Sequence, residues 1–280
     1  MCAPNVIETV RRTVSRRELL GTISAATLGA ACGGSAPGES STAVSPEPQS
    51  RRFDQIFDLT HVLTMSIPVY PSLTKPQMHQ TASLEENGVY NNDLVFGEHT
   101  GTHIDAPMHF AEGGLTTDQL PAERFFAPLV ILSIAARASG NPDTAVTIED
   151  ILAWEQKHGR LPEGAFVAML SGWGDRISDA EAFTNADEAG VTHYPGFSGE
   201  TASFLCEERN IVGVGVDTFS LDTGNAEGYP AHRTFLPAGK YGIELIANLD
   251  TVPVAGATII VGAPKHERGS GGPARVFAVN

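Results

Sequence analysis

The chain has 280 residues, enough for one large domain or two small ones, and its hydrophobic fraction of 41% is ordinary for a globular protein. It has 18 Lys and Arg residues against 33 Asp and Glu residues, which gives a formal net charge of −15. A surface of this sign repels phosphate backbones, so nucleic acid is excluded as an expected partner. The acidic residues are dispersed along the chain, as expected of a solvated surface.

A twin arginine, Arg16 and Arg17, precedes a modest apolar run that ends at Cys32. A basic region, a short apolar stretch and small residues before a cleavage point are typical of an export signal, and paired arginines indicate the twin-arginine type. Residues 19–31 are too few and too weakly apolar to span a bilayer comfortably. Residues 1–32 therefore predict export to the periplasm or the cell surface, with an amphipathic surface helix as the alternative.

Cys32 stands where the lipid-carrying cysteine of a lipoprotein would stand, although Gly29 occupies a position where leucine is usual. Lipid attachment, which would tether the mature protein to a membrane, and simple cleavage with release both remain open. Residues 33–52 are rich in Ser, Pro, Gly and Ala and have no apolar period, which predicts a flexible linker. The folded domain is expected over residues 53–280.

The rest of the chain predicts mixed α and β structure. Short apolar or β-branched runs bounded by Gly, Pro and Asp indicate buried strands at residues 127–136, 164–173, 211–218, 251–264 and 274–279. Residues 147–159 predict a helix that begins with a capping box between Thr147 and Asp150. Residues 198–210 predict a second helix, with Ser198 as its N-cap. Helices placed between buried strands favour an α/β or α+β domain over a sandwich, and we expect a mixed sheet with flanking helices.

One short stretch, EHTGTHIDAPMHF at residues 98–110, holds three of the nine histidines and an aspartate. In an extended segment alternate side chains share a face, so His99, Gly101, His103 and Asp105 would point the same way. Two imidazoles and a carboxylate that converge on one point suit zinc, manganese or iron(II). The glycine would leave room for an ion, and the spacing therefore predicts a metal site.

A proline in the same stretch, Pro107, should turn the chain and let His109 approach this face without strict alternation. A histidine beside the ligands but free of the metal suits a general acid or base. Five other histidines stand alone and are expected at the surface or in supporting positions: His61, His79, His158, His193 and His266.

The stretch HTGTHIDAPMH resembles the HxGTHxDxPxH signature of the cyclase family of metal hydrolases, which includes bacterial kynurenine formamidases and isatin hydrolases. The segment at 213–222 is similar to the family's strand and turn that end in Ser-x-Asp, and Ser171 to Trp173 fall where the family has a Thr-Gly-Trp turn. His232 is followed twelve residues later by Glu244, as in the family, although Ile246 and Ala247 then depart from its Glu-Asn-Leu pattern. The resemblance covers the chain from about residue 53 to its C-terminus.

The resemblance implies a swivelling β/β/α fold that assembles as a homo-oligomer, a dimer or tetramer. It implies that His99, His103 and Asp105 bind a first divalent metal, zinc or manganese. It further implies that His232 and Glu244 serve as ligands in members with two metals, so the chain would hold one or two ions. His109 matches the general acid or base.

The implied reaction is hydrolysis of a carbon–nitrogen bond in a small amide, such as an aryl or cyclic amide, by a metal-activated water. Two alternatives remain open: a lactone or ester hydrolase at the same site, and a metal-binding lipoprotein without catalysis. His109 speaks against the second alternative, because a pure binding site has no need of an uncoordinated histidine.

Three further residues are expected around this site. Kynurenine formamidases usually carry a Trp-Pro-Gly near the start of the domain, whereas this chain has Tyr70, which could stack on a substrate ring or be structural. Metal-bound imidazoles usually donate their other nitrogen to an oxygen acceptor, and Asp217 and Asp222 are the candidates for that acceptor.

Overall fold

The structure is a computed structural model that describes residues 53–280. The predicted export signal and linker, and with them Cys32, lie outside the described residues. No helix among residues 53–280 is long and apolar enough to cross a membrane.

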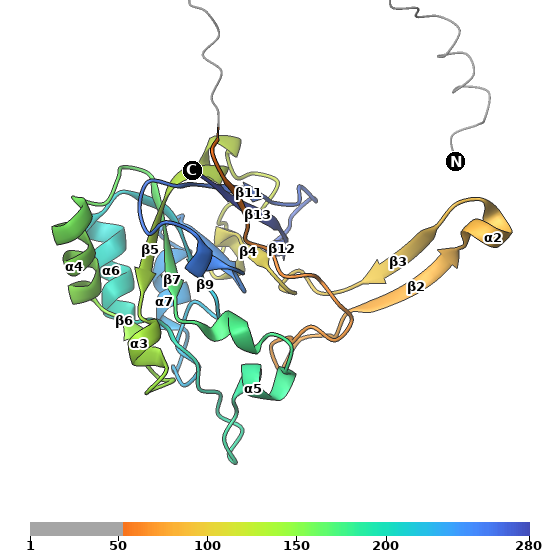
Figure 1. The fold of residues 1–280 in the computed structure, drawn as a ribbon, viewed down its shortest axis with the longest axis horizontal. Coiled ribbons are helices and arrows are strands. Elements are labelled where there is room, and N and C mark those ends of the chain that lie inside the picture. The colour runs from red at the N-terminus through yellow and green to blue at the C-terminus, as the bar shows by residue number, and fades with distance from the viewer. Residues whose placement is uncertain (1–52) are drawn as a thin grey trace, which may run out of the picture. The chain divides into compact units, whose positions relative to one another are not determined.

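A nine-stranded mixed sheet forms the centre of the domain (Figure 1), with the strand order β1-β13-β11-β5-β7-β9-β10-β4-β12. Its middle strands run parallel: β5 (Phe126–Ser133), β7 (Ala165–Leu170), β9 (Ile211–Val216) and β10 (Tyr241–Glu244). The outer strands pair antiparallel: β1 (Ile56–Asp58), β4 (His103–Asp105), β11 (Thr258–Gly262), β12 (Gly271–Pro273) and β13 (Arg275–Val279). The predicted α/β class with a mixed sheet is confirmed.

Helices cover one face of the parallel strands. The core on this face joins Val130 and Leu132 of β5 to side chains of α4 (Ile148–His158), α6 (Gly199–Glu208) and α7 (Pro230–Phe235). The predicted caps are present, because Thr147 and Asp150 form a capping box and the Ser198 hydroxyl accepts from the third residue of its helix. Shorter elements are α3 (Ala135–Ala138), α5 (Ala180–Thr184), β6 (Ala145–Val146), β8 (Gly196–Phe197), η1 (Pro107–His109), η2 (Ala122–Phe125), η3 (Trp173–Arg176) and η4 (Leu249–Thr251).

The opposite face of the sheet encloses a second apolar core. Strands β12 and β13 lie near opposite ends of the strand order, yet only Ala274 separates them in sequence. The sheet must therefore curl until its ends approach each other. Residues from both ends, such as Ile104 of β4 and Val276 of β13, share this core with Leu129 of β5.

The structure shortens several of the predicted elements. The strand expected at 251–264 is confined to β11 at 258–262, because Pro253 has no N–H to donate and Gly256 turns the chain with a φ of 95°. The second helix ends at Glu208 rather than near Asn210, since Arg209 already has an extended backbone.

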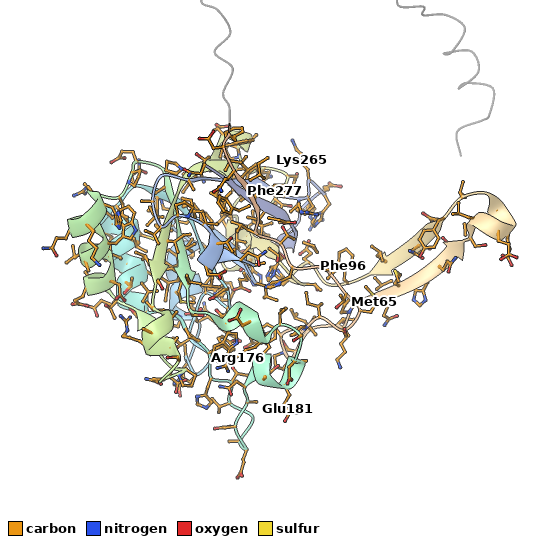
Figure 2. All side chains as sticks on the ribbon, viewed as in Figure 1. Met65, Phe96, Arg176, Glu181, Lys265 and Phe277 are labelled. Atoms are coloured by element: carbon orange, nitrogen blue, oxygen red, sulfur yellow. The ribbon has the colours of Figure 1, made fainter. Side chains whose placement is uncertain are left out.

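A hairpin that the sequence did not predict projects from the domain (Figure 1). It consists of β2 (Gln77–Ala82), α2 (Leu84–Asn87) and β3 (Asn91–Val95), and we call residues 77–95 the arm. Figure 2 shows its side chains reaching into solvent, with Met65 and Phe96 beside its base. Of the sixteen exposed large apolar side chains among the described residues, six lie on the arm: Met78, Leu84, Val89, Tyr90, Leu94 and Val95.

Candidate metal centre and active site

The short strand β4 brings two of the candidate ligands, His103 and Glu244, together. It pairs with β10 so that His103 lies opposite Glu244, at the carboxyl end of a parallel strand. Because side chains alternate along a strand, His103 and Asp105 share one face while Ile104, with no exposed surface, enters the apolar core on the other. His103, Asp105 and Glu244 are all buried. This placement agrees with the general location of sites beyond the carboxyl ends of strands.

We had expected the motif to run as one extended segment, and it does not. Strand β4 covers only residues 103–105, and the chain turns at Gly101, whose φ is 65°. A Cβ at Gly101 would lie 3.2 Å from a methyl carbon of Leu63, so glycine is needed for the turn and the close packing rather than to leave room for an ion. His99 consequently reaches the cluster from a bend outside the strand.

His232 comes from α7, far from the motif in sequence. Its Nδ1 lies 2.6 Å from Oδ2 of Asp222, and Asp222 also accepts from the backbone N–H of Ala231. Asp222 thus occupies the supporting position we expected for it, and it leaves the Nε2 of His232 facing the cluster. That Nε2 lies 3.2 Å from Glu244 and 3.3 Å from Asp105.

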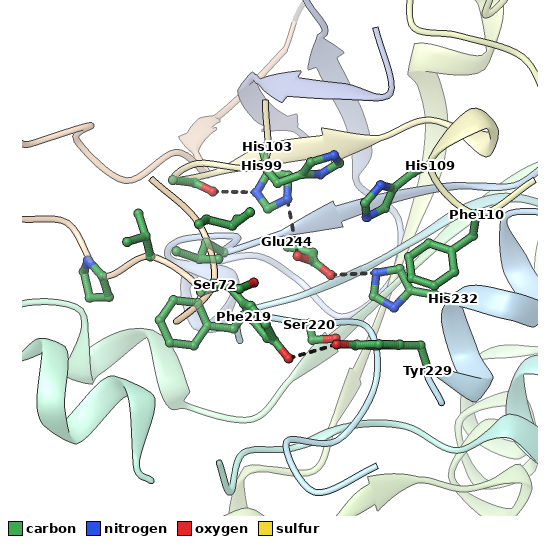
Figure 3. A pocket seen from close by; sticks show the side chains of 16 residues that line it. Ser72, His99, His103, His109, Phe110, Phe219, Ser220, Tyr229, His232 and Glu244 are labelled. Carbon is green, nitrogen blue, oxygen red and sulfur yellow. Dashed lines mark hydrogen bonds and ion pairs between the residues drawn. The ribbon is translucent and has the colours of Figure 1, made fainter. Parts of the chain in front are cut away.

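Asp105 is the centre of the cluster, and Figure 3 shows the histidines and Glu244 that surround it. Its Oδ1 lies 2.6 Å from Nδ1 of His99 and 3.4 Å from Nε2 of His103, and its Oδ2 faces His232. Two sets of three residues offer ligand atoms within 4.8 Å of one another: His99, Asp105 and His109, and His103, Asp105 and Glu244. The structure therefore brings together all five predicted ligands.

The donor set fits a divalent metal. The Nε2 of His103 and the Oδ2 of Asp105 are buried atoms that make no hydrogen bond within residues 53–280. Buried polar atoms are rarely left without a partner, and imidazole nitrogen with carboxylate oxygen is a usual donor set for zinc, manganese or iron. The Nδ1–H of His103 donates to the carbonyl of Gly101 at 2.8 Å, which leaves Nε2 as the lone pair that a metal would take.

The charges of the cluster also favour a cation. Burial by itself would lower the pKa of His103, but the neighbouring carboxylates of Asp105 and Glu244 outweigh it and raise that pKa to about 10. Burial would raise the pKa of Asp105, yet the neighbouring imidazoles of His103, His232 and His99 hold that pKa well below its usual range. These carboxylates therefore stabilise positive charge at this point.

His109 lies beside the cluster, at the end of the short helix η1 that Pro107 begins, as predicted. Its ring stacks on that of His99, with centroids 3.9 Å apart. Burial lowers the pKa of His109 to about 4, so its imidazole is neutral at physiological pH. A neutral imidazole can accept a proton.

The cluster forms one wall of a cavity of about 230 Å³ (Figure 3). Aromatic side chains form much of the remaining wall: Tyr70, Phe110, Phe219 and Tyr229. The hydroxyl groups of Tyr70 and Tyr229 lie 3.2 Å apart and join two loops across the cavity. Tyr70 thus lines the cavity, and its contact with a substrate stays a prediction. No sequence signal had identified Phe110, Phe219 or Tyr229.

Asp217 lies elsewhere. Its carboxylate accepts from the backbone N–H groups of Ser171, Gly172 and Trp173 and from the Ser171 hydroxyl, and it contacts none of the candidate ligands. Burial raises the pKa of Asp217 to about 6, against these hydrogen bonds. The residue fixes the Ser-Gly-Trp turn rather than an imidazole.

Known proteins resemble this chain in sequence and in fold. The model of the family described as "Putative cyclase" matches residues 57–223. Isatin hydrolase from Roseibium aggregatum is 34% identical over 243 residues, covering 80% of this chain and 91% of the relative, and kynurenine formamidase from Salinibacter ruber is 26% identical over 222 residues, covering 79% and 95%. The solved structure of isatin hydrolase A from Ralstonia solanacearum is 36% identical and superimposes with a TM-score of 0.76 over 80% of this chain and 91% of that one. The chain therefore belongs to the cyclase family.

Proposed function

We propose that the chain is a metal-dependent amidohydrolase that cleaves the carbon–nitrogen bond of a small aryl or cyclic amide with an activated water. The observation that carries this proposal is the buried cluster around Asp105. Two of its polar atoms, Nε2 of His103 and Oδ2 of Asp105, are without hydrogen bonds, and the cluster opens onto a cavity beside His109. The relatives named isatin hydrolase and kynurenine formamidase support an amide as the substrate.

The residues that would hold the metal are His99, His103, Asp105, His232 and Glu244. When bound, a divalent cation polarises a carbonyl oxygen and lowers the pKa of a water. We propose zinc or manganese, since both accept this mixture of nitrogen and oxygen ligands. The two oxygens of Asp105 face different histidines, which supports room for one or two ions.

His109 supplies the proton transfers. Its neutral imidazole accepts a proton from the attacking water and then donates it to the nitrogen that leaves. This double role requires an imidazole that is neutral at the start of each turnover. Burial keeps the ring of His109 neutral because it lowers the pKa of that residue. Proton transfer of this kind needs His109 to remain free of the metal.

The cavity favours an uncharged aromatic substrate. Its wall contains four aromatic rings besides the histidines, and no Lys or Arg side chain is among the described residues that line it. A carboxylate on the substrate would therefore have no Lys or Arg side chain to pair with in the cavity wall. The paired hydroxyls of Tyr70 and Tyr229 offer a polar contact at the side of the cavity that these two loops close.

The test is a metal and activity measurement on the purified protein and on His103→Ala. We expect the wild type to hold one or two equivalents of zinc or manganese and to hydrolyse an aryl formamide or a cyclic aryl amide, and the variant to lose both properties. Hydrolysis of lactones or esters but not amides would favour the alternative substrate class. Stoichiometric metal with no hydrolysis of either class would favour a non-catalytic binding protein, and absence of bound metal would refute the proposal.

We also propose that the protein is a homo-oligomer, a dimer or tetramer, whose subunits pack through the arm. A two-stranded hairpin alone is at best marginally stable in water, and this arm exposes Met78 and Leu94 directly opposite each other. Replacing both by Asp should lower the mass measured in solution by light scattering to that of a monomer. Val62→Asp, at an apolar residue 80% exposed outside the arm, is the control. A monomeric wild type would contradict this proposal.

We further propose twin-arginine export to the periplasm or cell surface, with a lipid on Cys32 as a possible tether to a membrane. The paired arginines at positions 16 and 17 and the small residues before Cys32 support it. Expression of the full chain followed by cell fractionation tests export, with Arg16→Lys and Arg17→Lys together as the blocked control. Mass spectrometry of the exported protein distinguishes a lipidated Cys32 from a free N-terminus.

A further inference from the structure

His99 is held from behind by a chain of polar groups that reaches the surface. Its Nε2 lies 3.1 Å from the hydroxyl of Ser270, and that hydroxyl lies 2.5 Å from Oε2 of Glu98. The same carboxylate oxygen accepts from the backbone N–H of Ser270, while Oε1 lies 2.6 Å from Nε2 of His266, whose side chain is 44% exposed. Asp105 lies on the other side of His99, 2.6 Å from its Nδ1.

The hydrogens in this chain can be assigned by counting donors. An ionised Glu98 carboxylate can only accept, so the single hydroxyl hydrogen of Ser270 must point toward it. The hydroxyl then has only lone pairs to offer to His99, which must therefore donate from Nε2. With the hydrogen on Nε2, a neutral His99 presents the lone pair of Nδ1 to a carboxylate oxygen of Asp105 only 2.6 Å away. A cation bound by both atoms would relieve the repulsion between them, and without a metal a second proton on Nδ1 would take its place.

We infer that Glu98 and Ser270 are positioning residues that fix the Nε2–H tautomer of His99, so that His99 binds the metal through Nδ1. This inference rests on the proposed metal centre. His103 and His232 show the opposite arrangement, because their Nδ1 atoms are taken by Gly101 and Asp222 and their Nε2 atoms face the cluster. The centre would thus combine one Nδ1 ligand with two Nε2 ligands.

Packing holds the ring of His99 in the same orientation. A Cβ on Gly271 would lie 2.6 Å from Cε1 of His99, so the backbone of β12 lies directly against the edge of the ring. The ring of His109 stacks on its face. His103 is held by the backbone of strand β4, whereas His99 stands in a bend. The orientation of the His99 ring therefore depends on these contacts and on Ser270.

The experiment measures tautomer and metal affinity in the intact protein. In zinc-loaded protein with nitrogen-15 histidine, NMR should show a protonated Nε2 and a metal-bound Nδ1 for His99. Ser270→Ala and Glu98→Gln should each weaken zinc binding roughly 10–100-fold in a chelator competition, as loss of a hydrogen-bond partner of a metal-binding histidine typically does. Asp143→Asn, which breaks a carboxylate–histidine pair at the surface away from the cavity, should leave zinc affinity unchanged.

The outcomes separate this inference from the proposed function. If the wild type binds zinc with a hydrogen on Nδ1 of His99, the inference is wrong and the metal centre stands. Unchanged zinc affinity in both variants, with their fold verified by circular dichroism, would also overturn it. If the wild type binds no metal, the proposed centre fails and the inference fails with it. The NMR result on the wild type decides the tautomer even if a variant does not fold.

Discussion

Two clusters in this molecule combine histidine with two carboxylates, and they differ in burial and in hydrogen bonding. His193 lies at the surface, with Asp143 2.8 Å from its Nδ1 and Asp187 3.5 Å from its Nε2, so both ring nitrogens have a partner. His103 is buried with Asp105 and Glu244, and its Nε2 has no hydrogen bond.

The comparison teaches that residue types alone do not identify a metal site. Water and the neighbouring carboxylates satisfy the surface cluster as it stands. The buried cluster has desolvated polar atoms without hydrogen bonds, which costs free energy. A bound metal ion would supply the missing partner. Four predictions test this contrast between the buried site and the surface.

The largest effect is expected for His109→Gln. Loss of a positioned general acid or base typically lowers the rate by roughly 10²–10⁴-fold, and we expect kcat to fall by that factor with metal content unchanged. His193→Gln, in the surface cluster, should have full activity. The metal measurement matters because His109 also lies within ligand distance of Asp105. A variant that loses its metal would make His109 a ligand instead.

The next effect concerns stability in acid. Burial depresses the pKa of His109 to about 4, below its value of about 6.5 in the unfolded chain, so the stabilising effect of the neutral ring is complete above pH 6.5 and is lost as the pH falls toward 4. At pH 5 this loss amounts to about 2 kcal/mol. Metal-free wild type should therefore lose about that much more stability than metal-free His109→Gln between pH 7 and 5, measured by urea unfolding. An equal loss in both would contradict the depressed pKa.

A smaller effect is expected for Tyr229→Phe. The variant removes one hydroxyl of the pair that joins Tyr70 to Tyr229, and a typical hydrogen bond contributes about 0.5–1.5 kcal/mol. We expect KM to rise about 2- to 10-fold with kcat nearly unchanged, because both tyrosines line the cavity and their hydroxyls hydrogen-bond to each other and not to the cluster. Tyr90→Phe, on the exposed arm, is the matched control. A fall in kcat alone would place Tyr229 in the chemistry.

The smallest effect is expected for Asp143→Asn in the surface cluster. Water and salt screen exposed ion pairs, so the unfolding free energy should hardly change, and metal content should not change. A loss of metal in this variant would show that the surface cluster is also a metal site and would remove the contrast between the two clusters.

Sequence reasoning predicted those parts of the fold that depend on local signals. The helices at 147–159 and 198–210 begin at side-chain caps. Three of the four parallel strands, β5, β7 and β9, are apolar runs because both of their faces are buried, whereas β10 is too short and too mixed in sequence to have been predicted. Each of these signals lies within a dozen residues. The arm has no such signal, since its strands QMHQTA and NNDLV show little alternation of apolar and polar residues.

The ligands were predictable because a single motif holds three of them, whereas their supports were not. Ser270 is 172 positions from Glu98, and nothing near it in sequence marks it as a partner. Tyr229 has a positive φ of 57° that its residue type does not suggest, and its place in the cavity follows from the turn before α7. Such residues become visible only when the sheet has brought distant segments together.

Strand β4 is only three residues long, yet its register against β10 determines which of its side chains face the cavity. Side chains alternate along a strand, so an error of one residue in its pairing with β10 would turn Ile104 into the cavity and His103 and Asp105 into the apolar core. Two ionisable groups would then lie among hydrocarbon side chains, which is a severe energetic penalty. The same three residues that create the reactive centre thus reject misaligned chains, and selection for activity and selection against misfolding act on one tripeptide.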